Sequence, residues 1–417
     1  MLQDIKSLTR EELETQFAAW KQPKYRVAQL LEWLYVHRVT NWEAMTNLPK
    51  PFREKLKENF SLQTLELLRK QGARDPSSVA APALHGSTIA SAAGYGREQA
   101  AKSELRRVDT TQKFLWRLHD HSLIESVLIP ANPALYGEAS DRHTLCVSTQ
   151  VGCAYGCKFC ASGLDGLKRN LTPDEIVEQV LAVERWNASS SSSSNPTEES
   201  ITRTRTTTRT NERLIDNLVI MGMGEPLANY DHLLKALSIL NAPWGGGIGA
   251  RKITISTSGL APQIRRLANE PLQFRLAISL HGATDEVRNK IMPVNRKYPL
   301  KELVAACEEY QGQKGRMLTF EYILIAGVND SVGQAKPLAA LARRLFAKVN
   351  LIPYNQVEGL PWERPSEEVQ EKFLAALEKQ KVTATLRREK GHDIDAACGQ
   401  LRLKTEKELG GVSSASP

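Results

Sequence analysis

Short apolar runs alternate with amphipathic segments along residues 144–387 of the chain. Runs of four to eight apolar residues between polar turns are typical of buried strands, and apolar positions three and four residues apart predict helices. Strands and helices that alternate in this way form parallel sheets, so the pattern predicts an α/β fold, most simply an open or partial (β/α)6 barrel of the TIM type. We expect strands at about 144–148, 217–221, 252–257, 274–280, 317–323 and 348–352, a last strand near 382–387, and helices at about 172–186, 229–240, 262–269, 299–310, 331–346 and 366–380.

The first 70 residues follow a helical period instead and predict a small N-terminal helical domain. Thr9 and Glu12 form a capping-box pattern, and apolar residues recur at helical spacing after it and again after Pro23. Any one cation on these helices is typical of a solvated face, but the set, with Trp33 and Tyr35 among it, is compatible with a surface that contacts RNA. The cations are Lys21, Lys24, Arg26, His37, Arg38, Lys50, Arg53, Lys55 and Lys57.

Two stretches show neither the apolar period of a helix nor that of a strand. Residues 73–104 are rich in Ala, Ser, Gly and Pro and predict a linker, and the serine run followed by Thr and Arg at 187–212 predicts a disordered insertion. Residues 113–129 predict a β-hairpin with a polar turn. The expected division is an N-terminal helical domain at 1–70, a linker at 71–111, a core at 112–402 and a C-terminal tail at 403–417.

Composition narrows the class of protein. The 417 residues are 41% hydrophobic, which is ordinary for a chain with a sizeable core, and no run of eighteen apolar residues could cross a membrane. The N-terminus has no apolar signal-peptide segment, and three of the six cysteines lie within eight residues, which together favour a reducing cytoplasm. The net charge of +8 is compatible with an RNA partner.

Cys153, Cys157 and Cys160 form a Cys-x3-Cys-x2-Cys loop. Thiolates are soft ligands that suit iron–sulfur clusters, which four cysteines usually hold. Three local cysteines would leave one iron of a four-iron cluster open to S-adenosylmethionine (SAM). The alternatives are a zinc site or simply buried thiols, but zinc sites usually close with a fourth ligand nearby, and no cysteine follows before Cys307. The spacing therefore favours the cluster.

Polar residues follow five of the expected strands, at the ends where barrel-like folds place their chemistry. The Gly-rich turn at 222–226 lets a ligand approach the backbone, and its Glu225 could meet an ammonium group. Each cluster alone could merely form a turn or cap the next helix, but together they predict a pocket for a polar ligand beside the cysteine loop. The clusters are 153–160, 222–226, 256–259, 279–282 and 353–355.

Two further cysteines are candidates for chemistry. Cys398 lies among small residues outside the barrel pattern, and Cys146 lies on the first barrel strand, seven residues before the cysteine loop. Packing is the alternative for both, because free cysteine is often buried. We assign Cys307, which lies on an apolar helix face, to packing.

These motifs resemble those of the radical-SAM RNA adenine-C2 methyltransferases, the RlmN/Cfr family, and its RlmN branch most. The resemblance covers the N-terminal module and about residues 112–402, apart from insertions. It rests on the cysteine loop, Gly222-Met-Gly-Glu-Pro, Ser256-Thr-Ser-Gly, Ser279-Leu-His and Asp395-Ala-Ala-Cys-Gly-Gln. It implies a radical-SAM barrel in which Cys153, Cys157 and Cys160 hold a [4Fe-4S] cluster and in which SAM is bound by Gly224, Glu225, Ser256, Ser279, Leu280, His281 and Asn355.

The resemblance also implies a radical ping-pong mechanism with two SAM molecules per turnover, since C2 of adenine is too electron-poor to attack a sulfonium methyl group. One SAM methylates Cys398. The other yields a 5′-deoxyadenosyl radical that takes hydrogen from the S-methyl group, and the resulting carbon radical adds to C2. Glu125 then removes the C2 proton, and Cys146 closes a disulfide to Cys398 and frees the product. Between Pro130 and Arg142, shortly after Glu125, this chain has a longer loop than the family pattern.

The implied substrates are an adenosine of 23S rRNA near the peptidyl transferase centre and the adenosine 3′ of the anticodon in some tRNAs. An electron donor such as flavodoxin, a cytoplasmic location and a monomeric state complete the expectation. Two alternatives stay open: a Cfr-like C8 methyltransferase of 23S rRNA, and a non-catalytic RNA-binding protein with a structural metal site.

Overall fold

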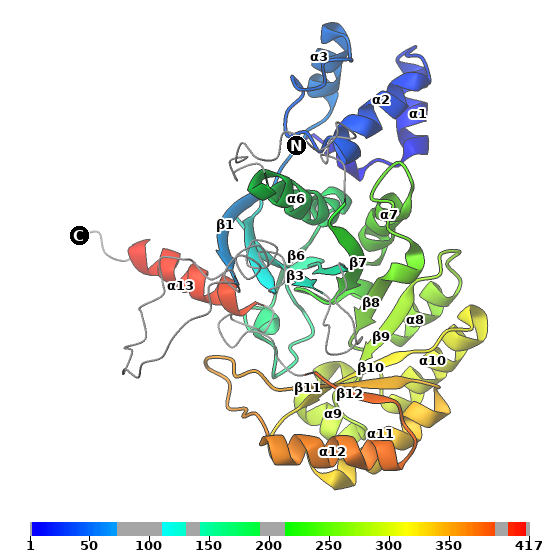
Figure 1. Ribbon diagram of the computed structural model, residues 1–417, viewed down its shortest axis with the longest axis vertical. Coiled ribbons are helices and arrows are strands. Elements are labelled where there is room, and N and C mark those ends of the chain that lie inside the picture. Colours follow the sequence, from blue (N-terminus) through cyan, green and yellow to red (C-terminus); the bar gives the residue numbers. More distant parts are fainter. Residues whose placement is uncertain (1, 73–110, 131–141, 192–212, 388–398, 414–417) are drawn as a thin grey trace, which may run out of the picture.

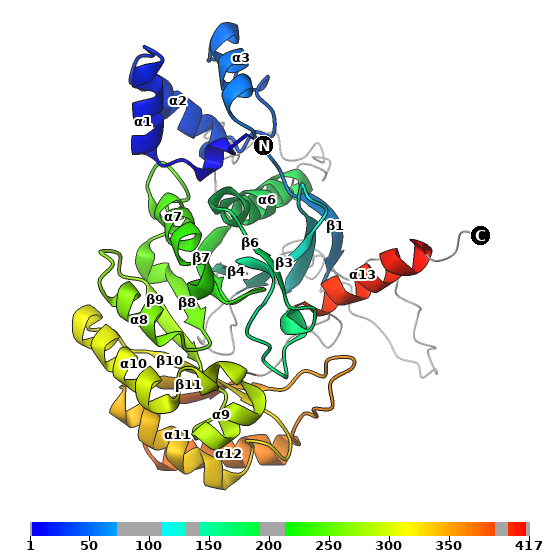
Figure 2. The same ribbon diagram turned by 180° about the vertical axis from the view of Figure 1, so that it is seen from behind.

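One ten-stranded sheet runs through the computed structural model (Figure 1 and, from behind, Figure 2), in the order β1-β2-β3-β4-β7-β8-β9-β10-β11-β12. Neighbouring strands from β4 to β12 are parallel, and β1 to β4 pair antiparallel. The structure describes residues 2–72, 111–130, 142–191, 213–387 and 399–413. The sheet is therefore mixed, with a parallel part and an antiparallel extension.

The parallel part confirms the predicted α/β alternation, since each expected strand and helix begins within two residues of its predicted start. The strands are β4 (His143–Cys146), β7 (Ile215–Ile220), β8 (Ile253–Thr257), β9 (Arg275–Ser279), β10 (Thr319–Leu324), β11 (Lys348–Pro353) and β12 (Ala384–Leu386). The helices between them are α6 (Pro173–Ser191), α7 (Tyr230–Asn241), α8 (Ala261–Ala268), α9 (Asp285–Ile291), α10 (Leu300–Lys314), α11 (Val332–Arg344) and α12 (Glu367–Lys379). Their apolar faces bury the core, as Ile264 and Leu267 of α8 illustrate.

The antiparallel extension contains the predicted hairpin. Its strands are β2 (Gln112–Arg117) and β3 (Leu123–Pro130), and β1 (Glu66–Gln71) joins the edge of the sheet at the predicted domain boundary. No helix in the described part of the chain combines the length and apolarity that a membrane crossing requires.

Three helical segments differ from expectation. One is α9, a short helix between β9 and α10 that was not predicted. Helix α6 continues to Ser191, so residues 187–191 are helical rather than disordered, and Trp186 packs edge-on against Phe114 at a centroid distance of 5.0 Å just before them. Helix α13 (Gln400–Ser413) has few apolar residues and was not predicted. The other parts of the predicted linker and insertion, 73–110 and 192–212, lie outside the described residues.

The N-terminal helices lie at one end of the molecule, next to α6 and α7 (Figure 1). They are η1 (Ile5–Ser7), α1 (Arg10–Ala19), α2 (Tyr25–Leu31), a π-helical turn (Glu32–Val36) and α3 (Lys50–Asn59). The predicted capping box is present: Thr9 N–H donates to Glu12 Oε2 at 2.7 Å, and Glu12 N–H donates to Thr9 Oγ1 at 3.3 Å.

Buried charges join this module to α6. Lys6 Nζ lies 3.5 Å from Asp4 Oδ1 and 3.4 Å from Glu178 Oε2, with all three side chains almost fully buried. Ser7 Oγ donates to Asp174 Oδ1 at 2.6 Å. Burial raises the pKa of Asp4 to about 6, and the Lys6 cation partly opposes that rise. The join between module and barrel therefore depends on one buried cation between two carboxylates.

We expect Lys6→Met to lower the free energy of unfolding by about 3 kcal/mol, because it leaves the buried Asp4 carboxylate without its counter-ion, whereas Glu178 keeps Arg185 as a partner. The folded-state pKa of Asp4 lies above its ordinary value of 3.8, so proton uptake favours the folded protein. The loss should therefore shrink as the pH falls from about 8 to about 5. Urea unfolding at both pH values measures it. Lys372→Met, which removes an exposed pair with Glu368, is the control and should cost less than about 0.5 kcal/mol; equal losses in the two variants would contradict the prediction.

Candidate functional site

The cysteine loop projects from an antiparallel hairpin of two short strands, β5 (Gln150–Gly152) and β6 (Leu167–Asn170). Gly152 has a φ of +76°, and a Cβ there would lie 2.0 Å from the carbonyl oxygen of Gly166, so only glycine fits. Cys153 N–H donates to the same oxygen at 2.9 Å. The base of the loop is thereby fixed at the first cysteine.

The far side of the loop is tied to the barrel. Lys158 N–H donates to the carbonyl of Ile291 at 2.9 Å, and the Lys158 carbonyl accepts from Trp362 Nε1 at 2.7 Å. The Phe159 ring packs edge-on against His281, with centroids 4.9 Å apart. The loop therefore lies against the end of β9, beside the polar strand ends as predicted.

The three cysteine thiols lie within electrostatic reach of one another. Burial raises the pKa of Cys153 to about 12, and the neighbouring charge of Cys160 adds to the rise. Burial, followed by the charges of Cys160 and Cys153, raises the pKa of Cys157 well above its usual range. Such thiols ionise readily only beside a positive charge, which a bound metal supplies.

This set of three sulfur donors fits the cluster that the motif implies, because soft thiolates are the usual ligands of iron–sulfur centres. Within the described residues, no three His, Cys, Asp or Glu side chains are grouped as the ligands of a metal ion, so the fit of the loop to a cluster rests on the chemistry of its donors. Cys307, assigned to packing, is fully buried in α10.

The Gly-rich turn after β7 packs against β5. Gly224 has a φ of +101°, and a Cβ there would lie 2.5 Å from Cβ of Gln150. Glu225 N–H donates to Gln150 Oε1 at 2.8 Å, and the buried Glu225 carboxylate accepts from the N–H groups of Leu227 at 3.1 Å and Ser258 at 2.7 Å. Burial raises the pKa of Glu225. This carboxylate ties the ends of β7 and β8 together and retains acceptor capacity, because each oxygen has two lone pairs.

The hydroxyl groups at the ends of β8 and β9 play two roles. Ser256 Oγ and Ser279 Oγ lie 3.2 Å apart and so meet across neighbouring strands. Thr257 Oγ1 instead accepts from Gly259 N–H at 3.1 Å, which is the turn-forming alternative.

The remaining predicted pocket residues lie at the ends of β9 and β11. His281 adopts a φ of +53° and is buried, and its Nδ1 accepts from Ile323 N–H at 3.1 Å. Burial and the nearby Arg288 cation lower the pKa of His281 to about 3, so it is a neutral imidazole with its proton on Nε2. Leu280 is buried beside it, and Asn355 is half-buried after β11.

Arg288 of α9 is a site residue that sequence reasoning missed. Its fully buried guanidinium donates to the carbonyls of Ser258 at 3.0 Å, Ser279 at 3.3 Å and Leu280. Burial lowers the pKa of Arg288 to about 10, which leaves it a cation at neutral pH. A single arginine in a short polar helix carries no sequence signal for this role.

Glu125 of β3 lies buried beneath the start of α13. Its Oε2 accepts from Gly399 N–H at 2.9 Å and its Oε1 from Arg402 N–H at 2.8 Å. Lys113 Nζ, also buried, lies 3.2 Å from Oε2. Gly399 is the residue after Cys398, which itself lies outside the described residues. The structure therefore brings Glu125 to the segment that follows Cys398.

Cys146 shares a face of the sheet with Glu125. Leu115 pairs with Glu125, and Val127 pairs with Cys146, in antiparallel register. Because paired residues point to one face and the period along a strand is two, Glu125, Val127 and Cys146 point the same way. Cys146 is buried there.

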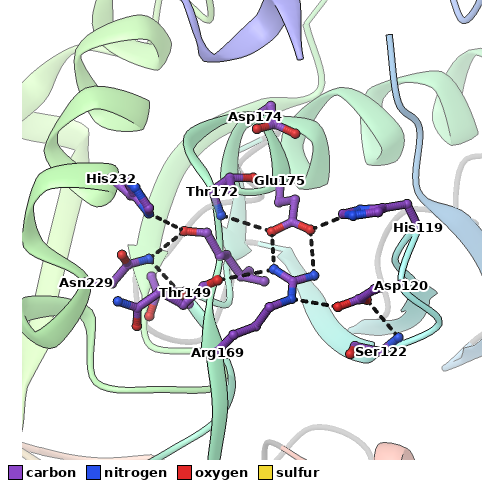
Figure 3. A network of polar contacts seen from close by, with 12 residues as sticks. His119, Asp120, Ser122, Thr149, Arg169, Thr172, Asp174, Glu175, Asn229 and His232 are labelled. Carbon is purple, nitrogen blue, oxygen red and sulfur yellow. Dashed lines mark hydrogen bonds and ion pairs between the residues drawn. The ribbon is translucent and has the colours of Figure 1, made fainter. Parts of the chain in front are cut away.

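A network of ion pairs and hydrogen bonds holds β6, the strand that follows the cysteine loop (Figure 3). Arg169 of β6 donates to Asp120 at 2.7 Å and to both carboxylate oxygens of Glu175 at 2.7 and 2.8 Å, and Glu175 also accepts from Thr172 N–H at 2.9 Å. Asn229 Nδ2 donates to the Leu171 carbonyl at 2.8 Å. The β2–β3 turn, α6 and the start of α7 thus fix the hairpin that carries the cysteines.

Two family models and a solved structure match this chain. Residues 147–334 match the model of the radical SAM superfamily, and residues 3–62 match that of the ribosomal RNA large subunit methyltransferase N-terminal domain. A radical SAM methyltransferase from Sphaerobacter thermophilus superimposes with a TM-score of 0.76 at 39% identity, covering 95% of this chain and 98% of that one.

Full-length relatives agree with these matches. A probable dual-specificity RNA methyltransferase, RlmN 3 of Opitutus terrae, is 50% identical over 96% of this chain and 95% of its own length. The probable RlmN of Akkermansia muciniphila is 47% identical over 98% of both chains, and the RlmN of Anaeromyxobacter dehalogenans is 40% identical over 95% of this chain and 91% of its own. With both parts of the chain matched and these identities sustained along it, the protein belongs to the RlmN family of radical-SAM RNA methyltransferases.

Proposed function

We propose that this enzyme methylates C2 of an adenosine in 23S rRNA, near the peptidyl transferase centre, and C2 of the adenosine 3′ of the anticodon in some tRNAs. The observation that carries the proposal is the position of Glu125, whose carboxylate accepts from the N–H of the residue after Cys398. A proton acceptor and a methyl-carrying thiol must act on the same carbon, so they must be neighbours. Family membership supports the RNA substrates.

Cys153, Cys157 and Cys160 hold the [4Fe-4S] cluster in this proposal. When bound, the cluster supplies the electron that splits SAM into methionine and a 5′-deoxyadenosyl radical. The chain contributes a fixed loop, since Gly152 pins its first cysteine and Lys158 ties it to α9. Arg288 contributes a buried cation close enough to affect the Cys157 thiol.

SAM lies in the pocket at the strand ends. The residues proposed to bind it are Gly224, Glu225, Ser256, Ser279, Leu280, His281 and Asn355. Support comes from their convergence: the turn of Glu225 contacts β5, Ser256 meets Ser279, and His281 contacts Phe159 of the cysteine loop.

Three residues transfer the carbon. Cys398 accepts a methyl group from one SAM and carries it, as an S-linked carbon, to C2 of the base. Glu125 takes the proton from C2. Cys146 attacks the sulfur of Cys398, and the bond between that sulfur and the transferred carbon breaks as the disulfide closes. The freed carbon takes up a proton to become the methyl group of the RNA, and the unpaired electron left by the radical addition passes to a one-electron acceptor, a role that the oxidised cluster would supply. Support for Cys146 comes from the sheet register, which turns it to the face that carries Glu125.

The turnover consumes two SAM molecules and needs an electron donor, for which we propose a flavodoxin-like protein. The monomeric state and the cytoplasmic location stay predictions. The Cfr-like alternative, C8 methylation, shares these motifs, and the relatives, all named RlmN, favour C2. Anaerobic reconstitution with a fragment of 23S rRNA, followed by mass spectrometry of the released nucleosides, tests the proposal. 2-Methyladenosine is expected, whereas 8-methyladenosine or no methylated base would overturn it.

Cys157→Ala is expected to abolish the iron–sulfur absorbance of anaerobically reconstituted protein, because two cysteines cannot replace three as ligands. Visible absorbance and iron analysis measure this. Cys307→Ala is the matched control, since it removes a buried thiol of the core. A Cys157 variant that keeps its iron, or a control that loses it, would contradict the assignment.

Cys398→Ala is expected to stop RNA methylation completely while the absorbance of the cluster is retained, because the variant has no sulfur to carry the methyl group. Methyl incorporation into the rRNA fragment measures turnover. Residual methylation at the wild-type rate would exclude Cys398 as the carrier and favour direct transfer.

Cys146→Ala is expected to accumulate enzyme that is covalently attached to RNA, because the thiol that releases the product is missing. A slowly migrating band on a denaturing gel, sensitive to both ribonuclease and protease, reports it. The double variant Cys146→Ala/Cys398→Ala should form no such band. If the single variant forms none either, Cys146 is a packing residue.

A further inference from the structure

Helix α13 is held mainly by contacts at its first turn. Three described ion pairs join its later turns to the rest of the protein, and each includes an exposed side chain: Arg69–Glu408 at 2.7 Å, Lys168–Glu406 at 3.5 Å and Lys407–Glu358 at 3.1 Å. Exposed pairs contribute little to stability, because water screens them. Leu401 packs with Leu115 and Leu123, which is a small apolar contact for a helix of 14 residues.

The contact at the first turn is different because it is buried. The side chains of Lys113 and Glu125 are only 1% and 2% exposed, and the carboxylate accepts two backbone N–H groups of α13 and its preceding residue. Charged acceptors form stronger hydrogen bonds than neutral ones, and an anion at a helix N-terminus is favoured by the helix dipole. This one carboxylate therefore provides the strongest attachment of α13 to the sheet.

The same attachment places Gly399 against the cysteine loop. Gly399 has a φ of +88°, and a Cβ there would lie 2.9 Å from Ser162 Oγ. Arg402, fully buried, pairs with Asp165 at 2.9 Å. Both partners follow Cys160 in the sequence, so the first turn of α13 is clamped between β3 and the segment that leaves the cluster loop.

We propose that Lys113 is a positioning residue of the methyl-transfer site: its ammonium group pairs with the Glu125 carboxylate, and this carboxylate fastens Gly399 and α13 to the sheet. Neutralising Glu125, as uptake of the C2 proton does, then loosens the segment that follows Cys398. Proton removal and the release of that segment towards Cys146 become one event. This last step rests on the proposed function, whereas the role of Lys113 in fastening α13 does not.

The chemistry of the carboxyl group explains the coupling. An ionised carboxylate accepts at both oxygens, but a protonated carboxyl group has one oxygen that donates. The hydroxyl oxygen that then faces the N–H of Gly399 or Arg402 keeps a lone pair but carries no charge, so it is the poorer acceptor and one of the two attachments is weakened. Glu125→Gln imitates this neutral state, since its amide nitrogen also donates.

Hydrogen exchange, measured by mass spectrometry on the reconstituted full-length protein, tests the proposal without SAM or RNA. Lys113→Met and Glu125→Gln should each exchange the amides of the first two turns of α13 about tenfold faster or more than the wild type. Lys113→Arg, which keeps the cation, should restore most of the protection. Lys407→Met, on the same helix, should change nothing there. Wild-type protection in Lys113→Met would overturn the proposal.

Lys113→Met alone leaves a buried unpaired anion, so it could fail to fold. The neutral double variant Lys113→Met/Glu125→Gln removes that penalty. It should retain the iron–sulfur absorbance and wild-type exchange in β7 to β11 and still exchange α13 rapidly. A double variant with a protected α13 would show that packing alone holds the helix and would overturn the proposal.

Methylation assays on the same proteins separate this inference from the proposed function. Lys113→Met should methylate the rRNA fragment at least about tenfold more slowly, and Lys113→Arg should recover. A Glu125→Gln variant that is inactive but has a protected α13 would sink the inference and leave the proposed function intact. A wild-type enzyme that methylates no RNA would end the proposed function, while the exchange results would still decide whether Lys113 fastens α13.

Discussion

The parallel direction of the strands from β4 to β12 is the constraint on which the site depends. Parallel strands end at the same edge of a sheet, so the turns that follow them lie close together even though they are far apart in the sequence. The backbone then locks the arrangement. Glu225 joins the ends of β7 and β8 through main-chain N–H groups, and Arg288 collects carbonyls from the ends of β8 and β9. The arrangement of these strand ends is consequently built into the fold.

Charge balance is the second constraint on this edge. Two thiols of the cysteine loop, Cys153 and Cys157, have raised pKa values, and the buried Glu225 lies close enough to raise both further. Arg288 is a buried cation near Cys157. A set of acidic groups that are costly to ionise together favours binding of a positively charged partner, whether metal or sulfonium, because the partner removes the penalty that the protein alone carries.

Local sequence determines much of this fold and less of its site. Every strand of the parallel part and each of its helices except α9 could be predicted because each has its own apolar period, and the capping box at Thr9 was visible in four residues. The cysteine loop could also be recognised, because its three cysteines lie within eight consecutive residues. Helix α13 could not be predicted, because it begins at a carboxylate 274 positions earlier in the chain, in Glu125, and its own apolar residues are few. Arg288 was missed for a similar reason: its partners are backbone carbonyls, which every sequence has.

The position of Glu125 raises a conflict that bears on how such an enzyme works. A general base must offer a lone pair to its substrate, yet each oxygen of this carboxylate already accepts a backbone N–H, and one of them also faces Lys113. Spare lone pairs remain, so proton uptake is possible, but it weakens a contact that holds α13 in place. A residue that only took up a proton would be better placed beside water. A residue that only held the start of a helix would be better placed beside neutral donors. Their combination in one side chain makes sense if the protein gains from linking the two events. The disulfide that ends the proposed turnover requires the segment after the methyl-carrying cysteine to move only once the proton has passed from C2 of the adenine to Glu125.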